Sequence, residues 1–232
     1  MPYARSLARQ DFLRGTQHIL QVTRQATLKK TGLPTTVTDM LFQAVIFKAC
    51  AQLEEYLKDV ISDWLFNAAK RKCFASSLPE DLRWFCVSQA HLAHYRQFMN
   101  TPDELRLVDA LKGKVQNRLL DDQAPIDGTL FPQSVVGDRK YPSTKNIRTL
   151  FNRIGLRNVL DLVNKRTRRN CVLMLESFLS VREAIAHQDP PALTYADVRT
   201  HTRNVQRFVD AVDHILYSHV IFHHGCDCWR TT

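Results

Sequence analysis

The sequence predicts an all-α protein. Only 7 of its 232 residues are Gly, and the strict alternation of apolar and polar residues that marks half-buried strands is scarce. Long stretches instead place apolar residues three and four positions apart, which is the spacing of one helix face. A chain of this length can bury a sizeable core as one large or two small domains. We therefore expect a helical bundle with an extra N-terminal helix and short inserted helices.

The predicted elements divide the chain into three parts. An amphipathic helix over residues 4–28 and a turn at Gly32-Leu33-Pro34 form an N-terminal arm, residues 1–35. The helical domain extends over residues 36–220, and residues 221–232 form a C-terminal tail. Because no internal repeat or low-complexity segment occurs, we treat residues 36–220 as a single unit.

The domain begins with its longest predicted helix. Apolar residues recur with the helical period from Thr38 to about Lys72. Glu54 lies beside that apolar stripe, one turn from Cys50, so its carboxylate is expected at the edge of the core. Shorter helices are expected over residues 79–99 and 102–120.

The second half of the domain is predicted to begin with a loop. Residues 123–143 are rich in Gly and Pro and form the one long loop of the chain. Helices are expected over residues 144–162 and 170–187. Thr194 and Asp197 then fit a capping box with Asp in place of Glu, which opens a last helix to about Val220.

Positive charge is concentrated in one stretch, residues 139–169, which we call the basic segment. It holds ten basic side chains and one acid, Asp161, and so accounts for the whole formal net charge of +9. Such a stretch favours binding to a nucleic-acid backbone, with a solvated charged surface as the alternative. The candidate binding residues are Lys145, Arg148, Arg153, Arg157, Lys165, Arg166, Arg168 and Arg169.

Directly after the basic segment, the helix over residues 170–187 carries an Arg and a His separated by four residues, Arg182 and His187. Arg presents a planar fork of donors that fits a phosphate, and His can exchange a proton near neutral pH. Projected on a helical wheel, Arg182 falls inside the apolar face, where its burial is costly unless it is paired or bound to an anion. If Arg182 is paired within the protein, Glu54 is the candidate partner. If Arg182 instead binds an anion, the pattern indicates phosphodiester chemistry without a metal.

The two side chains do not point the same way on a straight helix. His187 lies well round the helix from Arg182, so a single helix would not aim both at one phosphate. Either the helix frays at Gln188-Asp189-Pro190, or a second copy of the chain completes the site. The sequence leaves both explanations open.

These motifs resemble the HEPN superfamily of helical bundles, which carries an Arg and a His late in the domain, typically as Arg-Asn-x-x-Ala-His-Gly. Arg182-Glu-Ala-Ile-Ala-His187 stands in that place, ahead of a Thr-capped last helix. The RiboL-PSP type is most similar, because its acid-bearing early helix and its Asn-Ile-x-x-Leu-Phe-x-x-x-Gly-Leu segment have counterparts in residues 49–59 and 146–156. The resemblance covers about residues 38–220.

The resemblance implies a metal-independent endoribonuclease of the toxin or antiviral defence type. In such a homodimer, two copies of Arg182 and His187 share one composite site, and RNA is cut through its own 2′-hydroxyl. The implied partners are RNA, a second copy of the chain, and an antitoxin or another defence-system protein. C2 dimers are also the commonest oligomers.

Two positions depart from the family pattern. Glu183 stands where an Asn is usual, and Gln188 where a Gly is usual. Glu183 shares a helix face with His187, so its carboxylate can orient the ring and raise its pKa, or repel RNA phosphate. The sequence therefore also permits a catalytically inactive bundle that binds RNA or a protein. A purely structural helical adaptor would leave Arg182 and the basic segment unexplained.

The Cys and His residues outside the Arg182 and His187 motif give no strong functional signal. The six Cys residues lack a secreted framework's spacing, and no signal peptide or long apolar run occurs, so we expect reduced thiols in a cytoplasmic protein without membrane contact. The tail His223-His-Gly-Cys-Asp-Cys228 has zinc-ligand chemistry but no second ligand pair, which favours a flexible end. We assign no metal site and no cofactor, since neither a Glu-x-x-His motif nor a Gly-rich phosphate loop occurs. His91 and His94 are expected at the surface or in the core.

Overall fold

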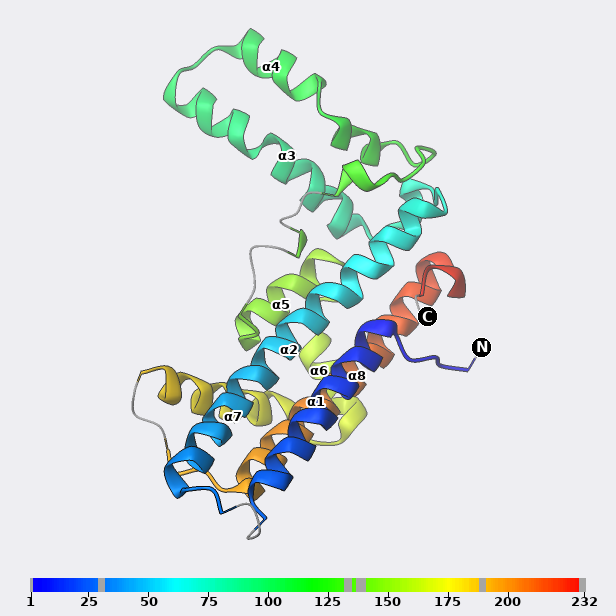
Figure 1. The fold of residues 1–232 in the computed structure, drawn as a ribbon. Helices are drawn as coiled ribbons and strands as arrows, with labels where there is room; N and C mark the ends of the chain where they lie inside the picture. Colours follow the sequence, from blue (N-terminus) through cyan, green and yellow to red (C-terminus); the bar gives the residue numbers. More distant parts are fainter. Residues whose placement is uncertain (1, 29–31, 132–134, 137–140, 188–190, 230–232) are drawn as a thin grey trace.

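Helix α2 (Thr35–Lys70) extends along the bundle in the computed structural model of this chain (Figure 1). Its buried side chains recur every three to four residues and include Ile46, Leu53, Ile61 and Trp64. This is the spacing that predicted the helix, because one face of a helix meets the core at every turn. The observed bounds differ by a few residues from the predicted start and end.

The first and last helices pack along α2. Helix α1 (Leu7–Ala26) contacts both α2 and α8 (Tyr195–His224), and Phe12 of α1 is 3% exposed in the main core. The segment before α1 is also tied down, because the buried carboxylate of Asp213 accepts hydrogen bonds from Tyr3 and from the hydroxyl and backbone N–H of Ser6. Helix α1 is thus packed as part of the bundle.

Helix α8 begins as the sequence predicts. The Thr194 hydroxyl accepts a hydrogen bond from the Asp197 backbone, and the Asp197 carboxylate accepts one from the Thr194 backbone, which confirms the capping box. The helix continues to His224, beyond the predicted end at Val220. The tail is not a loose end either, because Cys228 and Trp229 are buried and Trp229 donates to the Ala4 carbonyl.

The predicted helix over residues 144–162 is wrong as a single element. The structure has α5 (Thr144–Arg153) and α6 (Val159–Thr167), separated by a turn at Gly155. Gly155 has φ +82°, a conformation that side-chain-bearing residues rarely adopt, and a Cβ there would lie 2.9 Å from the Cβ of Pro79. The Gly in the family-like segment therefore breaks the helix. Helix α7 (Cys171–Ala186) follows, with Asn170 as its N-cap and His187 as its C-cap.

Helices α3 (Glu80–Asn100) and α4 (Glu104–Lys112) form a helical hairpin that projects from the end of the bundle (Figure 1). The predicted helix over residues 102–120 is interrupted at Gly113, where α4 ends and the 3-10 helix η3 (Val115–Leu120) follows. Two further 3-10 turns, η2 (Ala75–Ser77) and η4 (Gly128–Leu130), flank the base of this projection, and η6 (Cys226–Cys228) lies in the C-terminal tail near the N-terminus.

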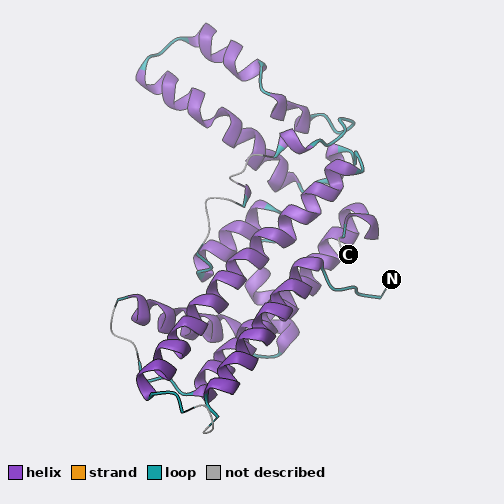
Figure 2. Ribbon diagram, in the orientation of Figure 1, coloured by secondary structure: helices purple, strands orange, loops and turns teal. Residues whose placement is uncertain are grey.

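The structure describes the chain except residues 1, 29–31, 132–134, 137–140, 188–190 and 230–232. Helices dominate this described part and it contains no strand, apart from an isolated bridge between Phe74 and Pro125 (Figure 2). The all-α prediction is confirmed. Among the described residues, no helix is long and apolar enough to cross a membrane.

Candidate functional site

Arg182 lies half-buried between two aromatic rings. The guanidinium carbon is 5.1 Å from the ring centre of Phe47 on α2 and 5.2 Å from that of Tyr141, which precedes α5. Both distances are within the range of cation–π attraction. The rings come from two elements that pack on α7, so the fold fixes the position of the positive charge that the helical wheel placed on the apolar face.

The Nε atom of Arg182 is buried and makes no hydrogen bond within the described residues. Buried donors are almost always bonded, because an unsatisfied one costs about 1–3 kcal/mol. A donor left in this state on a side chain shaped for oxyanions is available to an anion that reaches the site.

Glu54 lies in the same neighbourhood. Its Oε1 is 3.9 Å from the thiol of Cys50. Burial and then the Glu54 charge raise the pKa of Cys50, the Arg182 charge opposes both, and the net pKa is about 12. The thiol therefore lies within the fields of both charges, as expected if Glu54 faces the Arg182 end of α7. The ion pair between Glu54 and Arg182 stays a prediction.

His187 caps the end of α7. Its backbone N–H donates to the Glu183 carbonyl at 3.0 Å, and its side chain is exposed. The Glu183 carboxylate accepts a hydrogen bond from the Tyr141 hydroxyl at 3.0 Å. Burial, and then this bond, raise the pKa of Tyr141 above its usual range, so the phenol stays protonated as a donor. Gln188 and the predicted fraying over residues 188–190 lie outside the described residues.

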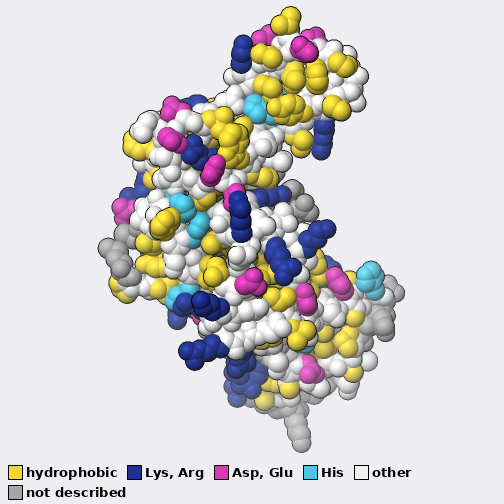
Figure 3. Space-filling view, turned by 180° about the vertical axis from the view of Figure 1, so that it is seen from behind, with side chains coloured by type: hydrophobic (Ala, Val, Ile, Leu, Met, Phe, Trp, Pro, Cys, Tyr) yellow, Lys and Arg dark blue, Asp and Glu magenta, His cyan; other side chains and the backbone are white. Residues whose placement is uncertain are grey.

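A groove of about 1170 Å³ lies at the other end of α7, between α1, the α6–α7 turn and α8. We call it the basic groove. It brings together four predicted candidates with three cations from other helices. The basic residues that line it are Arg9, Lys165, Arg166, Arg168, Arg169, Arg203 and Arg207. Lys and Arg side chains are seen gathered over the lower half of the molecule in Figure 3.

The positive charge of the basic groove is largely uncompensated. Its one lining acid, Asp210, is already paired with Arg9. Within the described part of the chain, the other six cations form no ion pair. Burial, followed by the charges of Arg166 and Arg9, lowers the pKa of the neighbouring His214 to about 4. A polyanion is the ligand that this charge distribution favours.

The remaining predicted cations are divided among several places. Lys145 and Arg148 are exposed on α5. Arg153 packs over the Phe85 ring at 4.4 Å, and Arg157 forms a two-bond ion pair with Asp81 at 2.6 and 3.0 Å. The latter two are thus held by the protein's own groups. Arg139 and Lys140 lie outside the described residues.

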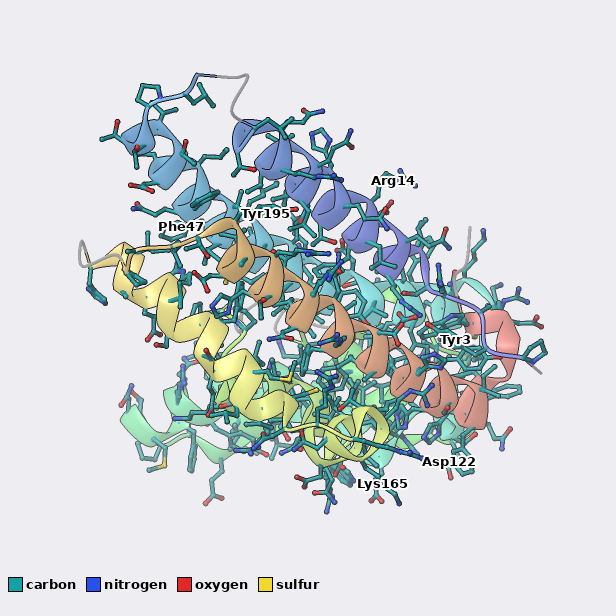
Figure 4. All side chains as sticks on the ribbon, turned by 90° about the horizontal axis from the view of Figure 1, so that it is seen from below. Tyr3, Arg14, Phe47, Asp122, Lys165 and Tyr195 are labelled. Carbon is teal, nitrogen blue, oxygen red and sulfur yellow. The ribbon has the colours of Figure 1, made fainter. Side chains whose placement is uncertain are left out.

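The basic groove and Arg182 are separated by the length of α7. About 16 Å of helix axis lies between Cys171, beside the groove, and Arg182. Figure 4 shows this separation, with Lys165 near the N-terminal end of α7 and Phe47 beside its C-terminal end. The two features are two sites on one chain, and only a ligand long enough to pass along α7 would reach both.

Several residues of these sites could not be predicted from the sequence. Phe47 lies outside the predicted apolar stripe, and Tyr141 lies in the long loop, where nothing marks its contact with α7. Arg203 and Arg207 form a pair four apart on α8, a weak sign of a basic face. Of the two histidines on α3, His91 is buried and its Nε2 lies 2.8 Å from the Asn117 side-chain oxygen, whereas its buried Nδ1 has no hydrogen-bond partner among the described residues.

An all-helical bundle with an Arg and a His at the end of an internal helix, followed by a capped last helix, has the features of a HEPN domain. The profile of the RiboL-PSP-HEPN family matches residues 18–218, and the chain therefore belongs to that family. HEPN domains have nucleotide-related or RNase-like functions. No curated protein and no solved structure matched the chain.

Proposed function

We propose that this protein is a metal-independent endoribonuclease of the toxin or antiviral defence type. The observation that carries the proposal is Arg182, held between Phe47 and Tyr141 with a buried Nε donor that makes no hydrogen bond to any described residue. His187 stands exposed little more than one turn further along the chain, where a substrate could meet it. Family membership supports the same class of reaction.

The reaction proceeds by transfer of the phosphoryl group within the RNA. A base removes the proton of the 2′-hydroxyl, the O2′–P bond forms, and the P–O5′ bond breaks as an acid protonates the departing 5′-oxygen. The products are a 2′,3′-cyclic phosphate and a 5′-hydroxyl. Arg182 stabilises the charge that develops on the phosphoryl oxygens, and His187 serves as base or acid.

A second copy of the chain supplies what one copy lacks. One His cannot act as both base and acid in a single step, whereas two copies of His187 and two of Arg182 suffice without a metal. The exposed position of His187 leaves its ring open to a partner chain. In this proposal the two basic grooves hold the RNA backbone on either side of the composite site.

A catalytically inactive RNA- or protein-binding bundle is the second candidate. It is favoured by Glu183, whose carboxylate is held by Tyr141 and so places a fixed negative charge beside Arg182. That charge would oppose an approaching phosphate. In this case the basic groove would still bind RNA, but no strand would be cut.

The direct test is cleavage of structured and single-stranded RNA in EDTA, followed by analysis of the ends. We expect 2′,3′-cyclic phosphates, and a rate lower by about 10² or more for His187→Ala, the usual scale for a general acid or base. His18→Ala, an exposed His on α1, is the matched control and should cut at the full rate. Equal activity of His187→Ala, or a strict need for Mg²⁺, would contradict the mechanism.

RNA-binding measurements on variants test the role of the basic groove separately from cleavage. The double variant Arg203→Gln/Arg207→Gln should weaken RNA binding and reduce the slope of log affinity against log salt by about two, one for each lost phosphate contact. The exposed Arg96→Gln on α3 serves as its control. His187→Ala should bind RNA like the unaltered protein.

A further inference from the structure

A cluster of metal-binding side chains lies where the C-terminal tail meets the end of α2. Cys73 follows α2, His224 ends α8 and Cys228 ends η6. One ligand atom from each lies within 4.8 Å of the other two. The tail alone offered an incomplete zinc motif, and the fold supplies Cys73 from far away in the sequence.

The spacing of the two sulfurs matches tetrahedral coordination. The Sγ atoms of Cys73 and Cys228 are 3.7 Å apart. Two thiolates bound to zinc at about 2.3 Å each, with a tetrahedral angle between them, would be about 3.8 Å apart. A disulfide would require about 2.05 Å instead. The sulfurs therefore lie at the separation that a shared zinc ion imposes.

His224 supplies the imidazole of the cluster. Both Nδ1 and Nε2 are buried and without a hydrogen-bond partner among the described residues. A buried polar group in this state is costly, and a metal bound to one nitrogen would remove part of that cost.

The surrounding backbone holds the cluster in place. The Cys73 carbonyl accepts a hydrogen bond from the Ile126 N–H at 2.7 Å, and the Cys228 carbonyl accepts one from the Asn67 side chain at 3.3 Å. Gly225, with φ +73°, turns the chain between His224 and η6. Cys228 itself is 0% exposed. The ligands thus come from a packed junction with fixed positions.

We infer that Cys73, His224 and Cys228 bind one zinc ion, with a further ligand completing the tetrahedron. Two soft thiolates and an imidazole favour zinc over the oxygen-seeking cations. The ion ties the tail to the end of α2, about 35 Å along that helix from Phe47 and the Arg182 site. Its role is structural, and the inference does not rest on RNA cleavage.

Metal content of the purified full-length chain is the first test. We expect about one zinc per chain by elemental analysis, and after exchange into Co²⁺ the visible bands and thiolate charge-transfer band of a tetrahedral sulfur-ligated site. Cys73→Ser and Cys228→Ser should each lower zinc affinity by more than about 100-fold, beyond the usual effect of losing a ligand's supporting hydrogen bond. Cys86→Ala, a buried Cys on α3, should leave the affinity unchanged.

Stability gives a second readout. Chelation should lower the melting temperature of the unaltered protein and of Cys86→Ala, but not that of Cys73→Ser. A chain that carries no zinc and shows no tetrahedral Co²⁺ spectrum would overturn the inference even if a Cys variant failed to fold. A Cys73–Cys228 disulfide, found by mass spectrometry without reduction, would overturn it as well.

Discussion

Arg182 illustrates how the fold determines the surroundings of a half-buried charge. Its rings at Phe47 and Tyr141 come from α2 and from the loop before α5, so neither neighbour could be inferred from the helix that carries the Arg. The position of Arg182 on the apolar face of α7 followed from the helical period alone. Its environment depends on which helices pack together, and single-helix periodicity does not contain that information.

Replacing Glu54 tests its predicted pairing with Arg182. Glu54→Gln removes the negative charge that lies with Arg182 near Cys50, so it should lower the free energy of unfolding by about 1–3 kcal/mol. Glu55→Gln, the exposed neighbour on the same helix, is the control and should change it by less than about 0.5 kcal/mol. Equal denaturation midpoints for the two variants would show that Arg182 does not depend on Glu54.

His219 should make the protein sensitive to acid. Its Nε2 donates to the Ile154 carbonyl at 2.8 Å, and burial, together with the His223 charge, lowers its pKa to about 4. Between pH 6.5 and 4 the unfolded chain binds a proton that the folded chain does not, so stability is full above pH 6.5 and falls as the pH drops through this window. Between pH 7 and pH 5, the free energy of unfolding of His219→Gln should fall by about 1–2 kcal/mol less than that of the unaltered protein, as measured by urea unfolding. Parallel pH profiles would refute this assignment.

Among the elements, the long helices were predicted well and the short ones were not. A helix such as α2 repeats its apolar spacing over many turns, so its core face is clear from sequence. Helices α5 and α6 were merged because the apolar pattern continues across their junction. What separates them is the positive φ of Gly155 against Pro79, a contact between distant parts of the chain.

The break between α5 and α6 can be tested at Gly155. Gly155→Ala forces a Cβ into a left-handed conformation 2.9 Å from the Pro79 Cβ, and it should destabilise the protein by about 1–3 kcal/mol. Gly113→Ala has ordinary room, with its nearest contact at 3.7 Å, and should be close to neutral. Two variants of equal stability in urea would show that the break is set by something other than Gly155.

At the scale of the whole molecule, function depends on how distant segments come together. The charge cluster was visible in the sequence as the basic segment, but only part of it lines the basic groove, where α1 and α8 add Arg9, Arg203 and Arg207. The proposed zinc ligands likewise include Cys73, which follows the end of α2 and lies far in sequence from the tail. Sequence patterns gave the candidate chemistry, and tertiary packing determined which residues share a site.

The proposed composite dimer can be tested with mixed chains. Each copy presents Arg182 and an exposed His187 at the end of α7, and two copies would supply both an acid and a base. A His187→Ala chain is co-expressed with an Arg182→Ala chain. In the expected mixed dimers, the first chain keeps Arg182 and the second keeps His187. We expect these dimers to cut RNA at a rate different from that of either homodimer, because their site draws on both chains.

In the proposed mechanism, two chains together build the site that cuts RNA. The measurement that tests it most directly is sedimentation of the protein at the concentration of the cleavage assay, with the rate recorded across its dilution. We expect a dimer at full activity, and a rate per chain that falls when dilution produces monomers. A protein that sediments as a monomer while cleaving RNA at the full rate would contradict it.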